Sequence, residues 1–434
     1  MAEPDVLVVG AGAAGIAAAR RLRALGRGVA VLEAGPRVGG RAHTDCSLGA
    51  PLDLGASWLH EAEHNPLTPL AQRLGFGLHD TGRRRRDLLL TAGGRPATEA
   101  ERADWEAAVD AFEAAAEARA AAGGPDIPLS EAVPHGGPWD ATAAHWLAEM
   151  INASPAERTS LRDYVATGLG GWNPQVREGL GTLVARLAEG LPVALGAPVR
   201  RLRWSGAAGI EAEGTRGALR ARAAIVTVST AVLAAGGIAF DPPLPAEVRD
   251  AVAGLPLGLL SKVALRAAPG APSRLGMRDF ARLGRQVAGP GDGPMSWMLW
   301  PFGRDHAVGF VGGDRAWALS REGAGVAEAE ARAELARYFG AAAVAHAFPP
   351  GPGAALASRW GKDPLFLGAY SHAVPGQSGA RVVLAGAALA GGRLRFAGEA
   401  CHPRYAATVG GAWASGEGAA KAVHAALGGG GAGG

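Results

Sequence analysis

The start of the sequence contains residues that could hold a nucleotide. Gly10, Gly12 and Gly15 follow one apolar run, and Glu33 closes the next. Glycines at this spacing allow a tight turn and let the backbone approach a pyrophosphate, whose negative charge faces the N-terminus of the following helix. A carboxylate at the end of the second run is placed to accept hydrogen bonds from a ribose. The pattern therefore predicts a dinucleotide-binding turn.

The segment after Glu33 narrows the choice of dinucleotide. Pro36-Arg37-Val38-Gly39-Gly40-Arg41 contains paired glycines, which let the backbone pass close to a ligand, and Arg41 can neutralise a phosphate. A fold that binds only NAD needs no such segment, so the sequence favours FAD. The alternative is a glycine turn with an exposed arginine.

Lysine is rare in this chain. Lys262, Lys362 and Lys421 stand against 40 arginines, as the coding bias of a GC-rich bacterium would produce. Arginine cannot replace lysine where a compact or titratable ammonium is required, so each retained lysine is of interest. Lys262 lies in an alternating run, Ser261 to Leu265, that is typical of a strand. A surface lysine that protects an edge strand is the alternative reading.

The elements that must position these residues form two groups. A strand–helix–strand opening is predicted at Asp5 to Val9, Ile16 to Leu25 and Val29 to Leu32. Strands at Val193 to Leu202, Arg222 to Val228 and Arg395 to Gly398, with a closing helix at Ala412 to Leu427, return the chain to the same domain. The predicted fold class is α/β, with a discontinuous Rossmann-like domain of the two-dinucleotide-binding-domain flavoprotein type formed by residues 1–80, 181–240 and 376–427.

A second, substrate-binding domain is predicted from residues 81–180 and 241–375. Alternating runs predict antiparallel strands at Ser261 to Leu265, Ser296 to Trp300 and Ala307 to Val311, and Pro242 to Pro245 marks a crossing between the domains. Helical patterns cover Glu99 to Ala122, Ala141 to Ile151, Ala156 to Val165 and Glu328 to Phe339. This domain should be α+β, with a mixed sheet flanked by helices. Residues 428–434 form a flexible tail.

Composition excludes several classes of protein. The chain has 434 residues, is 48% hydrophobic and carries a net charge of only +3, which gives no reason to expect nucleic acid as a partner. The basic cluster Arg83 to Arg86 is expected to be a solvated loop. Cys46 and Cys401 lie far apart, no metal site is readable, and we expect neither a leader peptide nor a membrane helix of about 20 apolar residues. We expect a cytoplasmic monomer or homodimer.

Taken together, the motifs resemble those of the flavin amine oxidase family, which includes monoamine oxidases, polyamine oxidases and flavin-dependent histone demethylases. The resemblance spans nearly the whole chain, and its block at residues 55–60 and the Thr408-Val409 ending look closer to the polyamine oxidases. It rests on the glycine turn with Glu33, Val38-Gly39-Gly40-Arg41, Gly55-Ala56-Ser57-Trp58-Leu59-His60, Asn65-Pro66-Leu67, Lys262, Trp360 with Tyr370, and Phe396-Ala397-Gly398-Glu399-Ala400.

The resemblance implies roles for the residues at the reactive end of a flavin. Lys262 would reach the flavin N5 through a water and stabilise negative charge that develops on oxygen. Tyr370 would stand over the flavin and flank the substrate amine, as an alternative to being a core tyrosine. A second aromatic of the substrate cage would fall at Thr408, which leaves the cage open on one side unless Tyr405 replaces it. This departure agrees with a long, thin substrate.

The resemblance also implies how the flavin is held. Ala369 stands where monoamine oxidases have the cysteine that binds flavin covalently, so noncovalent FAD is expected. Glu399 would bind the ribityl chain, or merely cap a helix, and the helix starting near Thr408 would point at the pyrimidine edge of the flavin. The expected FAD contacts are Gly10, Gly12, Ala13, Ala14, Gly15, Glu33, Ala34, Gly40, Arg41, Gly55, Ala56, Ser57, Trp58, Val199, Trp360, Gly398, Glu399, Thr408 and Val409.

The expected catalytic set is Lys262, Tyr370, His60 and Trp360. His60 matches a position at which several polyamine oxidases present a histidine to the substrate nitrogen, although such a histidine is as often a packing residue. Glu61 and Glu63 could attract distal ammonium groups or be ordinary loop charges. The resemblance implies an oxidase that takes hydride from the carbon beside an amine nitrogen and passes electrons to O2. A desaturase or protoporphyrinogen-type oxidase, or a non-catalytic FAD-binding protein, are the rivals.

Overall fold

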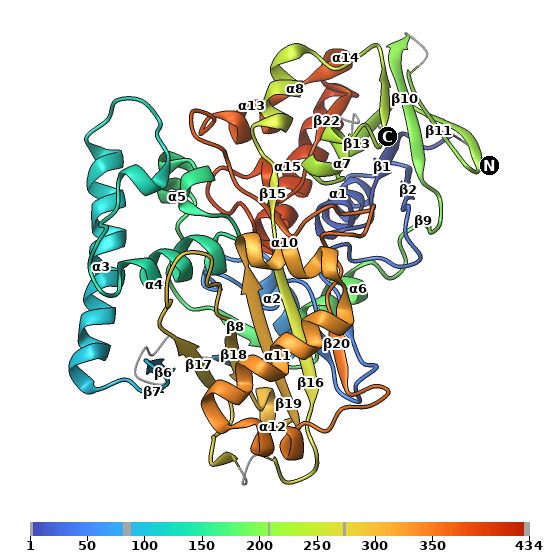
Figure 1. Ribbon diagram of the computed structural model, residues 1–434. Helices are drawn as coiled ribbons and strands as arrows, with labels where there is room; N and C mark the ends of the chain where they lie inside the picture. Colours follow the sequence, from blue (N-terminus) through green and yellow to red (C-terminus); the bar gives the residue numbers. More distant parts are fainter. Residues whose placement is uncertain (1–2, 81–87, 207–208, 272–274, 429–434) are drawn as a thin grey trace.

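The computed structural model describes residues 3–80, 88–206, 209–271 and 275–428 (Figure 1). The predicted basic loop at Arg83 to Arg86 and nearly all of the predicted tail lie outside these ranges. Within them, no helix is both long and apolar enough to cross a membrane. The same residues contain no cluster of histidine, cysteine and acidic side chains that could hold a metal ion.

A five-stranded parallel sheet forms the centre of the predicted dinucleotide domain. Its order is β22 (Leu394–Phe396), β13 (Ala223–Val226), β1 (Val6–Val9), β2 (Val29–Leu32) and β9 (Val193–Ala194). β1 and β13 are apolar and buried at every residue, as expected of parallel strands that are covered on both faces. The expected parallel sheet is therefore present, with strands drawn from three separate parts of the chain.

Two helices pack closely against each other beside this sheet. They are α1 (Ala13–Ala24) and α15 (Val409–Ala426). A Cβ atom at Gly416 of α15 would lie 2.1 Å from the Ala14 carbonyl oxygen, so only glycine permits this approach. α1 begins three residues earlier than predicted and includes Gly15, where a Cβ atom would lie 1.9 Å from the Gly10 carbonyl oxygen. The glycine turn and the helix start are thus one compact unit.

One predicted strand in this domain is wrong. The run Val193 to Leu202 is divided into β9, in the parallel sheet, and β10 (Val199–Gly206), in a separate sheet. Gly196 has a φ of +60° and Pro198 follows it, and both interrupt a continuous strand. The second sheet has the order β12 (Gly217–Ala221), β11 (Gly209–Gly214), β10 and β14 (Ala239–Asp241).

The other large sheet has seven strands and is mixed, as predicted. β16 (Leu260–Arg266), β19 (His306–Gly312) and β18 (Ser296–Leu299) are consecutive antiparallel neighbours, whereas β17 (Ala281–Arg285) runs parallel to β6 (Leu88–Ala92). The edges are β20 (Ala355–Ala357) and β7 (Arg95–Pro96). Helices α10 (Gly313–Glu322), α11 (Ala324–Phe339) and α12 (Ala341–Ala347) cover one face, in orange in Figure 1.

Successive side chains of β16 point to opposite faces of the sheet, and this alternation determines which of them face the predicted flavin site. Val263 and Leu265 enter the core beneath the covering helices, while Ala264 packs against Leu48 and Leu52 on the opposite face. Lys262 shares the face of Ala264 and therefore points toward the nucleotide-binding part of the chain. β16 lies between β19 and β20, so Lys262 is not on an edge strand.

A helical insertion follows β7 along the chain. α3 (Glu99–Ala121) starts at a capping box in which Thr98 and Glu101 bond to each other's backbone amides. α4 (Asp140–Ala144) continues into a wider helical turn over His145–Ile151. The predicted helix at Ala156 to Val165 is wrong in its first half, because Thr159 is extended and Ser160 caps a new helix, α5 (Leu161–Ala166).

The remaining elements are short. They are β3 (Thr44–Asp45), β4 (Leu52–Asp53), α2 (Leu67–Arg73), β5 (Leu78–Asp80), β8 (Pro174–Val176), α6 (Leu180–Leu187), α7 (Thr230–Ala234), α8 (Ala246–Ala253), β15 (Leu257–Gly258), β21 (Tyr370–Ser371), α13 (Ala380–Gly386) and α14 (Leu389–Gly392).

Candidate active site

The glycine turn and Glu33 form one hydrogen-bonded unit. The Glu33 carboxylate accepts hydrogen bonds from the amides of Ala11 and Gly35, each at 2.7 Å. Gly39 donates to the Ala11 carbonyl at 2.8 Å, which places the second glycine segment against the first. Gly12 is the N-cap of α1 and has no side chain to occupy the first amides of the helix. These open amides beside a carboxylate fit the pyrophosphate and ribose of FAD.

Arg41 and Glu399, two predicted FAD contacts, form an ion pair. Arg41 Nη1 donates to Glu399 Oε1 at 2.9 Å and to the Ala369 carbonyl at 2.8 Å. The pair lines a cavity of about 280 Å³ that also contacts Gly398 at the carboxyl end of β22. Ligands of parallel sheets bind at this end of the strands, so the cavity fits part of the expected cofactor site. Arg41 faces a carboxylate here, rather than standing alone to meet a phosphate.

Glu399 also belongs to a buried polar network that the sequence did not reveal. Its carboxylate accepts from the Ser371 hydroxyl at 2.6 Å and from the Ala407 amide at 3.1 Å. Arg381 donates to the same hydroxyl at 2.7 Å and forms a two-pronged ion pair with Asp163 at 2.6 and 2.8 Å. Burial alone would raise the pKa of Glu399, but Arg41, Arg381 and the Ser371 hydroxyl outweigh it and hold the pKa below its ordinary value. Glu399 is therefore more than a helix cap.

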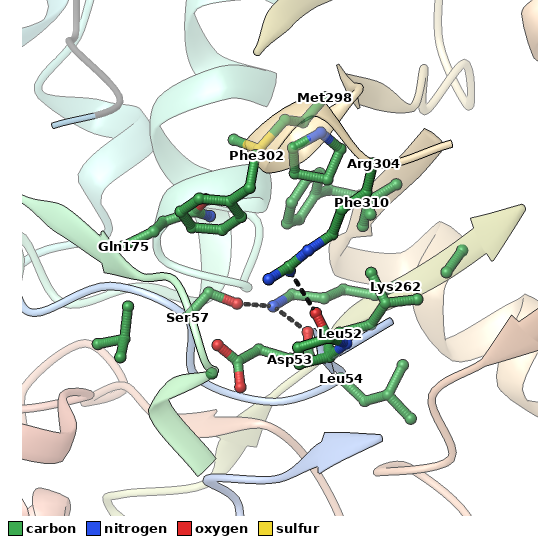
Figure 2. A pocket seen from close by; sticks show the side chains of 16 residues that line it. Leu52, Asp53, Leu54, Ser57, Gln175, Lys262, Met298, Phe302, Arg304 and Phe310 are labelled. Carbon is green, nitrogen blue, oxygen red and sulfur yellow. Dashed lines mark hydrogen bonds between the residues drawn. The ribbon is translucent and has the colours of Figure 1, made fainter. Parts of the chain in front are cut away.

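Lys262 is buried, with only 3% of its surface exposed. Its ammonium donates to the Asp53 carbonyl at 2.9 Å and to the Ser57 hydroxyl (Figure 2). It also donates to the Gly55 carbonyl at 2.5 Å. Burial lowers the pKa of Lys262 to about 8, partly opposed by the nearby Asp53. The alternative of a surface lysine is thus wrong, and a titratable ammonium is held against the segment predicted to line the flavin.

Two aromatic rings flank this ammonium. Lys262 Nζ lies 5.6 Å from the ring centre of Trp58 and 5.4 Å from that of Phe310. Phe310 is the residue opposite Lys262 in the neighbouring strand β19, and the two rings lie 5.8 Å apart. Both distances suit cation–π attraction, which offsets part of the cost of burying the charge. Trp58 was predicted from its motif, whereas Phe310 had no distinguishing sequence signal.

Tyr370 and Trp360 are held by different partners. Tyr370 follows Ala369, the residue whose carbonyl receives Arg41, and its hydroxyl donates to the Ile151 carbonyl at 2.9 Å. Burial raises the pKa of Tyr370, so its hydroxyl stays protonated. The Trp360 indole donates to the Leu54 carbonyl at 2.8 Å, and a Cβ atom at Gly55 would lie 3.0 Å from this ring. Trp360 therefore supports the backbone beside Lys262.

His60 has a partner that the sequence did not indicate. His60 Nδ1 lies 2.9 Å from the side-chain oxygen of Asn173, which belongs to a segment far along the chain. The next residue, Glu61, is buried and pairs with Arg404 at 2.8 Å, and Glu63 accepts from the Trp172 amide at 2.8 Å. Both carboxylates thus already have donors, which weakens the idea that they attract distal ammonium groups.

Thr408 caps the N-terminus of helix α15. It accepts from the Gly411 amide at 2.9 Å and donates to the Tyr405 carbonyl at 2.7 Å. α15 therefore starts at the residues predicted to face the flavin. Tyr405, the aromatic residue that could replace the missing ring of the substrate cage, lies three residues before this cap. Its ring lies 5.5 Å from the Arg404 guanidinium.

The two cysteines differ in exposure. Cys401 is buried next to Glu399, and burial raises the pKa of its thiol to about 12. Cys46 is exposed. Ala369 stands at the position that was compared with the flavin-linked cysteine of monoamine oxidases. Alanine has no thiol, so this position fits FAD held by noncovalent contacts.

Comparison with known proteins places the chain in a family. It matches the family described as flavin containing amine oxidoreductase over residues 13–171 and 135–424. Polyamine oxidase 4 of Oryza sativa subsp. japonica is 30% identical over 96% of this chain and 88% of its own length. Lysine-specific histone demethylase 1 homolog 1 of the same organism is 30% identical over 95% of this chain, which spans only about half, 51%, of that relative.

A solved structure confirms the fold. A mutant of putrescine oxidase, made in a redesign of its cofactor binding, superposes with a TM-score of 0.78 at 23% sequence identity, covering 98% of this chain and 99% of the other. The structural likeness confirms the expected two-domain α/β architecture. Together with the residues that fit a flavin dinucleotide, the comparisons show that this chain belongs to the flavin-containing amine oxidoreductase family and that its cofactor is FAD.

Proposed function

We propose that the protein is an oxidase that breaks a C–N bond of an alkyl amine of the polyamine type and produces H2O2. When bound, FAD supplies the chemistry of accepting a hydride from the carbon beside the amine nitrogen and passing two electrons to O2. The substrate becomes an iminium ion, which water hydrolyses to an aldehyde and an amine. The chain itself must position the amine, exclude bulk water and stabilise developing charge.

The observation that carries this proposal is the buried ammonium of Lys262. It is fixed by three acceptors and two aromatic rings, next to segment 55–58, for which flavin contacts are expected. A preorganised cation in a buried site can stabilise negative charge on oxygen without rearranging during the reaction. A desaturase on the same fold would not need this cation, so the geometry favours an oxidase.

Tyr370 and His60 are the residues we propose to orient the amine. The hydroxyl of Tyr370 is fixed by Ile151, and the His60 ring is fixed by Asn173, so neither side chain must be ordered by the substrate. The ring of Tyr370 can pack against apolar carbon next to the nitrogen. A neutral His60 nitrogen can accept a hydrogen bond from the amine.

The choice of a linear alkyl amine rests on the second cage position. Thr408 is engaged in capping α15, so one side of the expected cage has no aromatic ring at this position and accommodates an extended chain. The comparisons alone do not choose between a small and a large substrate, because a polyamine oxidase and a histone demethylase are both 30% identical to this chain.

A peroxide assay over a panel of amines tests the proposal. The panel contains diamines, spermidine, spermine, acetylated polyamines and aryl amines, with the flavin-free protein as the control. We expect peroxide with linear alkyl amines and little with aryl amines. Peroxide formed only from aryl amines would refute the substrate class, and no peroxide with any amine would refute the oxidase.

A further inference from the structure

A cavity leads toward Lys262. The cavity, shown in Figure 2, spans about 500 Å³, part of it open to solvent, and Lys262, Ser57 and Asp53 line its deep end. Phe302 and Arg304, which are partly exposed, also line it. Neither His60 nor Tyr370 is among the described residues that line it.

The middle of this cavity is apolar. Ala264 and Val308 face it from the paired strands β16 and β19, and Met298 and Val176 complete the wall. Ala264 lies two residues from Lys262 on the same face of the sheet and also lines the cavity, so a larger side chain at position 264 would narrow the cavity beside Lys262. Apolar walls favour a small apolar molecule over an ion.

The charges around the cavity exclude an ammonium substrate. The Lys262 ammonium and the Arg304 guanidinium both line it, and like charges repel in a poorly solvated space. Asp53 is the one carboxylate among its described lining residues, and its oxygens already accept from the Thr44 hydroxyl and the amides of Leu180 and Gly181. A cationic amine would therefore meet two like charges and a single carboxylate whose oxygens are already hydrogen-bonded, which disfavours its entry.

We propose that this cavity is the route by which dioxygen reaches Lys262, separate from the approach used by the amine. The inference rests on the proposed oxidase function. O2 is small and apolar, so it partitions into the apolar middle of the cavity and meets the ammonium only at the deep end. There, the two electrons of the reduced flavin and two protons convert O2 to H2O2, while Lys262 stabilises the negative charge that precedes protonation.

Ala264→Phe tests this route because the added ring fills the space between Val308 and Lys262. The holoenzyme is first reduced chemically in the absence of amine, and its reoxidation by O2 is followed by flavin absorbance. We expect the rate constant to fall by about tenfold or more, while anaerobic reduction by amine changes by less than about twofold. Ala264→Leu provides a smaller obstruction if the phenylalanine variant does not fold, and Val263→Leu, on the opposite face, is the matched control.

Xenon binding tests the oxygen route without catalysis, because xenon occupies apolar cavities. Crystals of the holoenzyme under xenon pressure should show xenon beside Ala264 and Val308, and crystals of Ala264→Phe should not. Absence of xenon there in the wild type, or unchanged reoxidation in Ala264→Phe, would overturn the proposal.

The same experiments separate the rival occupants. If Ala264→Phe slows reduction by amine more than reoxidation, the cavity is the amine route and the proposal is wrong. If Arg304→Met slows reoxidation more than Ala264→Phe does, the cavity serves an anion and the proposal is again wrong. Failure of every amine to reduce the wild type would refute the proposed function, whereas the oxygen route would still be measured with chemically reduced flavin.

Discussion

Replacing Lys262 by methionine keeps the length of the side chain and removes its charge. The ammonium is buried and is a donor to two backbone carbonyls and the Ser57 hydroxyl. Loss of one preorganised electrostatic group typically costs about 3 to 4 kcal/mol in the step that it assists, a factor of about 10² to 10³ in rate. Reoxidation of the reduced flavin by O2 should therefore slow by this factor, because negative charge develops on oxygen only in that half-reaction.

The same substitution has a cost in folding stability. Each buried acceptor left without a donor costs about 1 to 3 kcal/mol, while the buried charge, which was itself unfavourable, is removed. We expect these opposing effects to leave a loss of about 2 kcal/mol in the free energy of unfolding, measured by denaturant titration. Lys362→Met is the control, since Lys362 is exposed and its ammonium donates to the Arg321 carbonyl, away from the flavin site.

Stopped-flow absorbance measures both half-reactions of the Lys262→Met variant. Reduction by amine under anaerobic conditions should fall much less than reoxidation. If reoxidation stays within about threefold of the wild type, a difference below about 1 kcal/mol, then the ammonium does not assist oxygen and serves only to hold the backbone of the flavin site.

The remaining predictions concern the cofactor, pH and the buried network. Glu33→Ala removes an acceptor worth about 1.5 to 3 kcal/mol to FAD, so purified protein should have a low flavin-to-protein ratio, and a stoichiometric ratio would refute the ribose contact. Acid precipitation should release intact FAD, since Ala369 has no thiol; flavin left on the polypeptide would contradict this. Reduction by amine should rise toward alkaline pH as the amine loses its proton, whereas reoxidation should fall as pH rises through about 8, where Lys262 deprotonates. Reduction that does not rise would contradict the neutral-amine requirement, and reoxidation that does not fall would contradict the role of Lys262. Arg381→Met leaves Asp163 unpaired in the interior and should cost about 3 to 5 kcal/mol in unfolding free energy; a loss below about 1 kcal/mol would show that the ion pair contributes little.

Local sequence patterns were sufficient to predict one part of the candidate site, the glycine turn with Glu33. The glycine turn and Glu33 lie within one strand–helix–strand unit, so their spacing along the chain already fixes their neighbourhood in space. Lys262 was identified because lysine is rare and its motif is distinctive. Its burial follows from the alternation of β16, but its acceptors could not be inferred, since they lie more than two hundred residues away.

Other features depend on contacts that no local pattern encodes. Asn173 holds His60, and Arg381 joins Asp163 to Glu399 through Ser371, across separate segments of the chain. The predicted strand Val193 to Leu202 was wrong for a related reason. β9 and β10 belong to different sheets because the chain turns between them at Gly196, which has a φ of +60°.

The central claim is that a flavin in this chain takes electrons from an amine and gives them to oxygen. The most direct measurement adds an alkyl amine to the purified protein without oxygen and follows the yellow absorbance of the flavin, then admits air. The proposal predicts that the amine bleaches the flavin and that air restores the colour as H2O2 appears. A flavin that no amine bleaches, although chemical reductants do, would contradict the claim.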